Sequence, residues 1–424
     1  MTYVVGITLL IFIFLSIPIA LSLGLASTAG ILYIGDLTLQ IMAQRIISGI
    51  GHFTLMALPF FIFAGYLMEQ GGISKRLINM VSAFVGHRTG GVAIVTVLTA
   101  MLFSSISGSG SATTAALGSI LIPAMMARGY SKGFASSVQA ASGELGIIVP
   151  PSIAMVIYGV VTETSIGDLF LAGVIPGMIL GLSMAILVSY LSRRKGYTGT
   201  EKADWSQRFK AFRQSFWALL MPLIILGGIY TGVFTPTESA CVAVIYALIV
   251  GSFIYRELNW TSFKKAVVQS LMTSGMIMFI IACASIFSWL ITREQIPQKF
   301  AALFAQISSE PYVFLLLCNI FLFIIGMFID ASPAITILAP ILTPVAVSFG
   351  IDPVHFGVII VVNMALGMIT PPVGVNLFVA ARIADIRMEQ MLKNLIPFWL
   401  VIVVVVLIIT YIPQLSLWLP NLNS

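Results

Sequence analysis

Two carboxyl side chains, Asp330 and Glu144, lie within long apolar stretches of the sequence. A charged carboxylate is costly at the depth of a lipid bilayer, so such a group normally has a cation partner or a functional role. Residues 311–349, which surround Asp330, contain no Lys or Arg, and a bound cation is therefore the economical partner. The alternative is a protonated or hydrogen-bonded structural acid. For Glu144, proton relay, cavity lining and a structural or snorkelled position all stay open.

Two similar proline motifs interrupt apolar segments: GIIVPPS at residues 146–152 and GMITPPV at residues 367–373. Proline removes an amide donor from a helix and clashes with the preceding turn. In lipid, the carbonyl groups freed in this way are tolerated only inside protein or beside a water-filled cavity. Paired interruptions in corresponding halves of a membrane protein indicate a transport site. We therefore expect broken helices at residues 131–160 and 353–380.

Segments rich in small or polar residues precede both motifs. Residues 91–126 carry SSISGSGSATT at 104–114, and residues 311–349 centre on MFIDASPA at 327–334. Two full crossings need about 40 residues plus a turn, so each segment fits a re-entrant hairpin whose tip lies near mid-membrane. A packing face of small residues is the alternative. A phosphate-binding loop is disfavoured because the Lys of the Walker motif is missing.

Hairpin tips and broken helices together supply oxygen ligands. Carbonyl groups at helix ends, hydroxyl groups and a carboxylate suit sodium, a hard cation. The first predicted sodium cage comprises Ser105, Ser107, Ser109, Gly146, Val149 and Pro150. The second predicted sodium cage comprises Phe328, Asp330, Ser332, Gly367, Thr370 and Pro371. We expect at least two sodium ions and no organic cofactor.

The half-helices that follow the breaks point amide groups toward the middle of the membrane, where their partial positive charge favours an anionic group. We therefore expect a carboxylate substrate to bind between the two tips, beside the sodium ions. The predicted substrate-binding residues are Ser107, Ser109, Ser152, Asp330, Thr370 and Asn376.

The composition places the chain in a membrane. Of its 424 residues, 59% are hydrophobic and 8% are charged, and the mean hydropathy is +1.07. Such a chain has too little polar surface for a soluble globule. The net charge of +6 does not indicate nucleic acid, because the basic residues lie between apolar runs. We expect an all-α polytopic membrane protein that keeps residues 4–20 as a helix rather than losing them as a secretion signal.

An offset of 221 residues relates two parts of the chain, since it pairs both proline motifs and also Pro123 with Pro344. We infer homologous halves at residues 1–192 and 214–424. The expected crossings are 2–17, 18–34, 52–70, 131–160 and 168–192 in the first half, and 215–234, 236–255, 270–290, 353–380 and 388–412 in the second. Because five is odd, the second half is expected to be inverted relative to the first.

The basic residues orient this layout. With a periplasmic N-terminus, 18 of the 21 Lys and Arg residues fall on the cytoplasmic side, including those of the inter-repeat linker at residues 193–213. The exceptions are Arg45, Arg293 and Lys299. Residues 36–50 and 257–269 carry apolar residues at helical spacing and are expected as interfacial helices.

Five motifs resemble the large membrane subunit of the TRAP transporters, the tripartite ATP-independent periplasmic transporters of bacteria, a DctM/SiaM-like family. They are SIPIALSLG at 16–24, FSSISGSGSATTAALGSILIPAM at 103–125, GIIVPPSIAMVIYG at 146–159, FTPTESA at 234–240 and MITPPVGVNLFVA at 368–380. The resemblance extends along essentially the whole chain. Glu144 and Arg382 depart from the family pattern, and Arg382 either touches substrate or caps a cytoplasmic helix end.

The resemblance implies an elevator-type importer in the bacterial cytoplasmic (inner) membrane, powered by sodium rather than by ATP. It implies two protein partners, a small four-helix membrane subunit and a periplasmic solute-binding protein. Substrates of the family are mostly organic acids, including sialic acid and C4-dicarboxylates, and nothing in the sequence chooses among them.

Three other functions compete with this one. A stand-alone sodium-coupled carboxylate symporter would share the two-hairpin layout but need no binding protein. A membrane-embedded hydrolase would need a nucleophile with a base, paired acids or a metal set, and the intramembrane ionisable groups are only Asp330 and Glu144. A passive channel fits two closed hairpins less well than an occluding transporter does. We therefore expect a transporter and not an enzyme.

Overall fold

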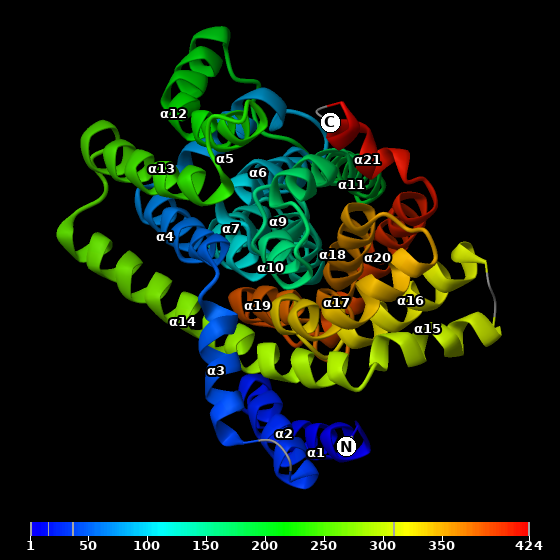
Figure 1. Ribbon diagram of the computed structural model, residues 1–424. Helices are drawn as coiled ribbons and strands as arrows, with labels where there is room; N and C mark the ends of the chain where they lie inside the picture. Colours follow the sequence, from blue (N-terminus) through cyan, green and yellow to red (C-terminus); the bar gives the residue numbers. More distant parts are fainter. Residues whose placement is uncertain (1, 16, 36–37, 308–309, 423–424) are drawn as a thin grey trace.

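The computed structural model describes residues 2–15, 17–35, 38–307 and 310–422, and within them the regular structure is helical (Figure 1). Nine of the described helical segments are long and apolar enough to cross a membrane. Ser16, the first residue of the SIPIALSLG motif, lies outside the described residues. The expected all-α architecture with several membrane-crossing helices is confirmed.

Two helix pairs occupy the segments expected as hairpins. They are α6 (Gly91–Ser107) with α7 (Gly110–Ala127), and α16 (Pro311–Gly326) with α17 (Ala331–Ser348). We call the turn between the first pair tip 1 (residues 107–112) and the turn between the second pair tip 2 (residues 327–333). At tip 1, Gly108 has a positive φ of 61°, a conformation that glycine adopts without a Cβ clash. The hydroxyl of Ser109 accepts a hydrogen bond from the amide of Ala112 at 3.4 Å and so caps α7.

Both proline motifs break their helices. The helical segments α8 (Lys132–Gly143) and α9 (Leu145–Ile148) end before residues 149–152, which we call break 1, and α10 (Ile153–Thr162) follows. Similarly, α18 (Pro353–Met368) ends before residues 369–374, which we call break 2, and α19 (Val375–Ala384) follows. The Pro150–Pro151 and Pro371–Pro372 peptide bonds are cis.

The first helix pair and the broken helices lie toward the centre of the molecule, whereas α16 of the second pair lies toward one edge (Figure 1). In the most apolar window of Lys132–Thr162, 78% of the residues are buried inside the protein, against 22% for Trp205–Tyr230, which identifies the first as core and the second as periphery. The longer or outer helices are α1 (Thr2–Phe14), α2 (Ile19–Ile34), α4 (Ala57–Gln70), α11 (Ile166–Arg194), α12 (Trp205–Tyr230), α13 (Pro236–Ile249), α14 (Trp260–Arg293) and α20 (Glu389–Tyr411). Of these, α13 and α14 pack against α4, and α14 also packs against α2.

One expected element is wrong, and the bounds of another differ. Residues 257–269 do not form a separate interfacial helix, because most of them belong to the first turns of α14, a single helix of 34 residues. No proline lies within α14, so nothing separates its amphipathic start from its apolar continuation. The basic linker expected at residues 193–213 is partly helical. Its helical part includes the start of α12, which begins behind a capping box formed by Asp204 and Gln207.

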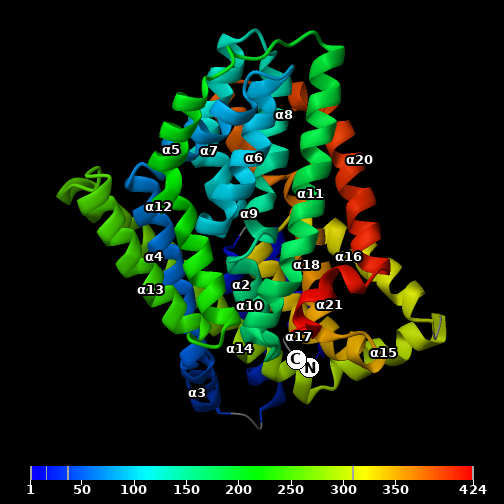
Figure 2. The ribbon, with the colours of Figure 1, turned by 90° about the horizontal axis from the view of Figure 1, so that it is seen from above.

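Several shorter helices complete the fold. The helix expected at residues 36–50 is present as α3 (Leu39–Ile50), although residues 36–37 lie outside the described part of the chain. Three others were not expected: α5 (Ile73–Val85), α15 (Ile296–Ile307) and α21 (Gln414–Asn421). Two short segments, η1 (Phe53–Met56) and η2 (Val250–Ile254), adjoin α4 and α13. Figure 2 shows α3 and both chain termini toward one end of the helix bundle and the link between α11 and α12 at the opposite end.

Candidate functional site

A cavity of about 670 Å³ lies between the two tips and the outer helices. Tip 1 contributes the six consecutive residues from Ser107 to Ala112, and tip 2 contributes those from Asp330 to Pro333. Residues beside both breaks also line it, including Ile153 and Met368, and α2, α4 and α14 supply the rest of the wall. The fold therefore brings two tips and two breaks, distant in sequence, to one cavity.

Tip 1 is fastened to the first broken helix. The amide of Ile153 donates to the carbonyl of Gly108 at 3.1 Å, which joins the start of α10 to the tip. Gly146 lies against the tip backbone, because a Cβ atom added there would be 2.6 Å from the carbonyl carbon of Ser109. The hydroxyl of Ser107 lies 2.7 Å from that of Thr113 on α7. Three residues of the first predicted cage, Ser107, Ser109 and Gly146, thus come together.

The other three residues of that cage, like Gly146, are not part of the cavity lining. Ser105 donates its hydroxyl to the carbonyl of Leu102 at 2.7 Å, within its own helix. The side chain of Val149 lies against Gly177 of α11, and Pro150 is buried within break 1. If these three residues hold an ion, they do so mainly through carbonyl oxygens, and their assignment stays a prediction.

Tip 2 is fastened to the second broken helix in a similar way. The amide of Val373, within break 2, donates to the carbonyl of Met327 at 3.2 Å. Gly367 lies against Gly326 at the end of α16, because a Cβ atom added at Gly367 would be 2.7 Å from the carbonyl oxygen of Gly326. A tip and its neighbouring broken helix therefore meet through backbone atoms in both parts of the chain.

Asp330 and Ser332 line the cavity, whereas the rest of the second predicted cage does not. The side chain of Phe328 is 57% exposed on the protein surface, so only its backbone is available as a ligand. The hydroxyl of Thr370 donates to the carbonyl of Leu366 at 2.7 Å and accepts a hydrogen bond from the indole N–H of Trp399 at 3.1 Å. Gly367 and Pro371 could bind a cation only through their backbone carbonyl oxygens.

Of the six predicted substrate-binding residues, Ser107, Ser109 and Asp330 line the cavity, and Thr370 does not. Ser152 is buried, caps α10 and donates its hydroxyl to the carbonyl of Ile147 at 2.5 Å. Asn376 is also buried and donates to a carboxyl oxygen of Glu144 at 2.7 Å. Their roles in substrate binding stay predictions. Arg382 is exposed on α19 and is not part of the cavity lining.

Three polar residues of the cavity wall escaped the sequence analysis. Tyr66 and Glu69 line the cavity from α4, and Thr273 lines it from α14, with the Tyr66 and Thr273 hydroxyls 3.1 Å apart. They lie within continuous helices, and no helix break marks their positions. The spacing of three residues between Tyr66 and Glu69, which places both on one helix face, was the available signal.

The polar groups of the cavity are suited to a cation and an anion side by side. Hydroxyl oxygens come from Ser107, Ser109, Ser111 and Ser332, and carboxyl groups come from Asp330 and Glu69. Carbonyl oxygens are available at the tips and breaks. Such all-oxygen donors match the preference of a hard cation. The start of α7 lies at tip 1, and its unpaired amide groups favour a negative charge.

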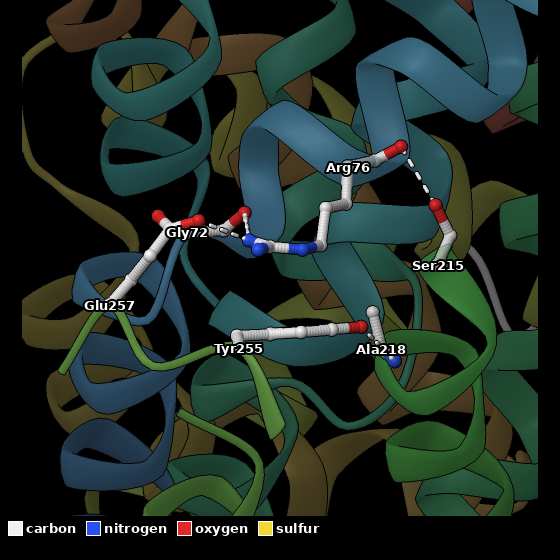
Figure 3. Close-up of polar contacts among 6 residues, drawn as sticks. All are labelled: Gly72, Arg76, Ser215, Ala218, Tyr255 and Glu257. Carbon is white, nitrogen blue, oxygen red and sulfur yellow. Dashed lines mark hydrogen bonds and ion pairs between the residues drawn. The ribbon is translucent and has the colours of Figure 1, made fainter. Parts of the chain in front are cut away.

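A second polar cluster connects α5 with the segment after α13 and with α12 (Figure 3). The guanidinium of Arg76 forms an ion pair with Glu257 at 2.7 Å and lies 3.8 Å above the ring centre of Tyr255. The hydroxyl of Ser215 donates to the carbonyl of Arg76 at 2.8 Å, and the Tyr255 hydroxyl accepts from the amide of Ala218 at 3.2 Å. These contacts join outer helices to one another and leave the cavity untouched.

The chain matches, over residues 6–415, the family model described as the tripartite ATP-independent periplasmic transporter, DctM component. It is 43% identical over 400 residues to the C4-dicarboxylate TRAP transporter large permease protein DctM of Pseudomonas aeruginosa, with 94% of each chain covered. It is also 43% identical over 409 residues to the isethionate TRAP transporter permease protein DctMQ of Oleidesulfovibrio alaskensis. That match covers 96% of this chain but 64% of the longer relative.

Among solved structures, the YdaH transporter of Alcanivorax borkumensis has a similar fold. The TM-score is 0.65, and the likeness covers 90% of this chain and 89% of that one. Because the two sequences are 17% identical, this likeness shows the fold alone.

Proposed function

Since this chain belongs to the DctM family of tripartite ATP-independent periplasmic transporter components, we propose that it is the large membrane subunit of a sodium-coupled importer of a small organic acid. One observation carries this proposal: both tips meet in a single cavity, and Asp330 is part of its wall. A binding pocket at paired helix interruptions is the arrangement that secondary transporters use for substrate and ions.

Sodium is the proposed coupling ion, with at least two ions bound. Asp330 and Ser332 would contribute to one site, and Ser107 and Ser109 to the other, with carbonyl oxygens completing each shell. A bound cation would also balance the charge of Asp330, which has no cationic neighbour on its own helix pair. The substrate anion would lie between the tips, close to the helix starts.

We further propose an elevator mechanism. The helix pairs and broken helices would move as one unit against a scaffold that includes α2, α4 and α14, because the cavity lies at the boundary between these two groups. The two halves, residues 1–192 and 214–424, would be inverted repeats. The N-terminus would be periplasmic and the link between α11 and α12 cytoplasmic. The link lies at the end of the bundle opposite the chain termini and α3 (Figure 2), which agrees with the segregation of basic residues.

The substrate and partners are also proposals. The relatives are named for C4-dicarboxylate and isethionate transport, and sialic acid is the other acid that the sequence resemblance implies. A small four-helix membrane subunit and a periplasmic binding protein would complete the transporter in the bacterial inner membrane. The incomplete coverage of the isethionate relative agrees with a second membrane component in that chain.

Reconstitution into proteoliposomes tests the proposal. Uptake of labelled C4-dicarboxylate, isethionate and sialic acid is measured with and without an inward sodium gradient, for the complete transporter and for this chain alone. We expect sodium-driven uptake of one acid by the complete transporter. Sodium-independent uptake would contradict the coupling, and full activity of the chain alone would favour a stand-alone symporter.

Substitution of Asp330 sharpens this test. Asp330→Asn keeps the side-chain shape but removes the charge, and we expect sodium-driven uptake to fall at least about tenfold, because a contact to a charged group contributes about 1.5–3 kcal/mol. The matched control is Asp385→Asn, at an exposed position with φ of 51° that Asn also tolerates. Intact sodium coupling in Asp330→Asn would exclude Asp330 as a ligand.

A further inference from the structure

A hydrogen bond between two buried side chains connects the helix segments beside the two breaks. The side-chain amide of Asn376 donates to a carboxyl oxygen of Glu144 at 2.7 Å, and the two residues are 232 positions apart in the chain. Both side chains are 0% exposed. A buried hydrogen bond to an acidic group is costly to break, because the remaining partner stays without solvent. The bond is therefore a rigid connection between the two parts of the site.

The positions of the two residues tie this bond to both predicted cages. Glu144 lies at the junction of α8 and α9, two residues before Gly146, which contacts the backbone of tip 1. Asn376 is the second residue of α19, immediately beyond break 2. Its amide nitrogen would be 3.1 Å from a Cβ atom added at Gly110, so it also lies directly against tip 1. One side-chain pair thus contacts tip 1 and the ends of both broken helices.

The pair also has two oxygens without a hydrogen-bond partner among the described residues, Oε2 of Glu144 and Oδ1 of Asn376. A side chain at position 144 that both accepts and donates would pair with the NH₂ group of Asn376 and also with its carbonyl oxygen. Glutamine meets this requirement, since its carbonyl accepts from Asn376 and its NH₂ group donates to the Asn376 oxygen. Glu144→Gln is therefore a substitution that keeps the connection, whereas an apolar side chain of similar length removes it.

We propose that Glu144 and Asn376 are positioning residues that couple ion binding at the two cages. This inference rests on the proposed function, because it requires two sodium sites. Ordering the peptide around one bound ion would hold the Glu144–Asn376 pair in place and so lower the entropic cost of ordering the other cage. The consequence is positive cooperativity between two sodium ions, transmitted by a bond that touches neither ion.

The experiment measures initial uptake by the reconstituted transporter as a function of sodium concentration. The variants are Glu144→Gln, Glu144→Met, Asn376→Leu and the double variant Glu144→Met with Asn376→Leu. For the wild type and Glu144→Gln we expect a Hill coefficient above one. For the other three we expect a coefficient near one and a roughly tenfold higher sodium concentration at half-maximal rate.

The double variant keeps the test independent of folding, because replacing both partners of a buried hydrogen bond by apolar groups of similar shape can be nearly neutral. The matched control is Tyr158→Phe. It removes a buried bond that also joins α10 to α18, from the Tyr158 hydroxyl to the carbonyl of Pro353 at 2.7 Å, but at the end of α18 opposite break 2. We expect this control to lose thermal stability but keep the wild-type Hill coefficient.

The outcomes separate the two proposals. Wild-type uptake that ignores sodium overturns the proposed coupling and this inference together. Sodium-driven uptake with the same Hill coefficient in all variants overturns the inference alone. Loss of sodium dependence in Glu144→Gln also overturns it, because the charge of Glu144 would then matter rather than its hydrogen bond. If Tyr158→Phe and Asn376→Leu changed the Hill coefficient equally, the effect would come from general packing, and the proposed role of the Glu144–Asn376 pair would be wrong.

Discussion

Two glycine substitutions test whether the contact between each tip and its broken helix is required for transport. Gly146 and Gly367 are separated by the 221-residue offset, and each lies against tip backbone or the adjoining end of a helix. A Cβ atom at Gly146 would lie 2.6 Å from the carbonyl carbon of Ser109, and one at Gly367 would lie 2.7 Å from the carbonyl oxygen of Gly326. Ordinary contacts begin at 3.4 Å, and the nearest backbone atoms, the Ser109 carbonyl oxygen and the Gly326 Cα, would be closer still. The backbone would therefore have to separate by more than 0.8 Å at Gly146 and by more than 0.7 Å at Gly367.

Two opposing effects determine how much each substitution changes the free energy of unfolding. Alanine is favoured over glycine within a helix by about 0.5–1 kcal/mol. Overpacking against neighbours typically costs about 1–3 kcal/mol, and backbone atoms cannot rotate away as side chains can. Gly146→Ala and Gly367→Ala should therefore lower the free energy of unfolding by up to about 2 kcal/mol. Transport should suffer more, because a displacement near 1 Å in a site can lower activity about 100-fold.

Sodium-driven uptake in proteoliposomes and thermal unfolding in detergent measure these two quantities on the same preparations. The control is Gly227→Ala on α12, where an added Cβ atom has nothing within 4 Å. This control should transport normally and unfold at the same temperature or slightly higher. If Gly367→Ala and Gly146→Ala transported as well as Gly227→Ala, close contact between tip and broken helix would not be needed, and the reasoning would fail.

Two further predictions concern the polar cluster around Arg76 and the orientation of the chain. Arg76→Ala should lower the free energy of unfolding by about 1–2 kcal/mol, because a partly exposed ion pair and a cation–π contact each contribute about 1 kcal/mol or less. Thermal unfolding measures this loss. Glu257→Gln, which removes the ion pair but leaves Arg76 over the Tyr255 ring, should have the smaller effect. Single cysteines placed at Lys202 and Ser48, in a background without Cys241, Cys283 and Cys318, should react with an impermeant thiol reagent from the cytoplasmic and periplasmic sides respectively. Labelling of both from one side would refute the proposed topology.

The helix pairs and breaks could be located from the sequence because strong local signals mark them. Two adjacent prolines cannot both continue a helix, so the ends of α9 and α18 follow from residues 149–151 and 370–372 within a few positions. The serine and glycine run at tip 1 likewise predicts a turn, and Gly108 has the positive φ that such a turn uses. The local sequence was therefore sufficient to locate tip 1 and both breaks.

Elements whose limits depend on tertiary packing were predicted less well. The amphipathic start of α14 carries Lys264 and Lys265, which suggested a separate helix, yet no residue there ends a helix and the chain continues in one piece. The inward positions of Tyr66 and Thr273 depend on how α4 and α14 pack, and periodicity alone does not say which neighbour a helix face meets. The same limit applies to Asn376, whose hydrogen bond to Glu144 no local sequence signal indicates.

A contrast between backbone contacts and side-chain bonds explains what the 221-residue offset can and cannot predict. The close approaches at Gly146 and Gly367 recur in both parts of the chain, because each needs only the absence of a Cβ atom. The bond between Glu144 and Asn376 does not recur, since the offset replaces its partners by Ala365 and Met155. A hydrogen bond needs two particular side chains from different elements, and a change at either one removes it. The 221-residue offset therefore predicts the backbone frame of this cavity, whereas the polar connection between Glu144 and Asn376 comes only from the folded structure.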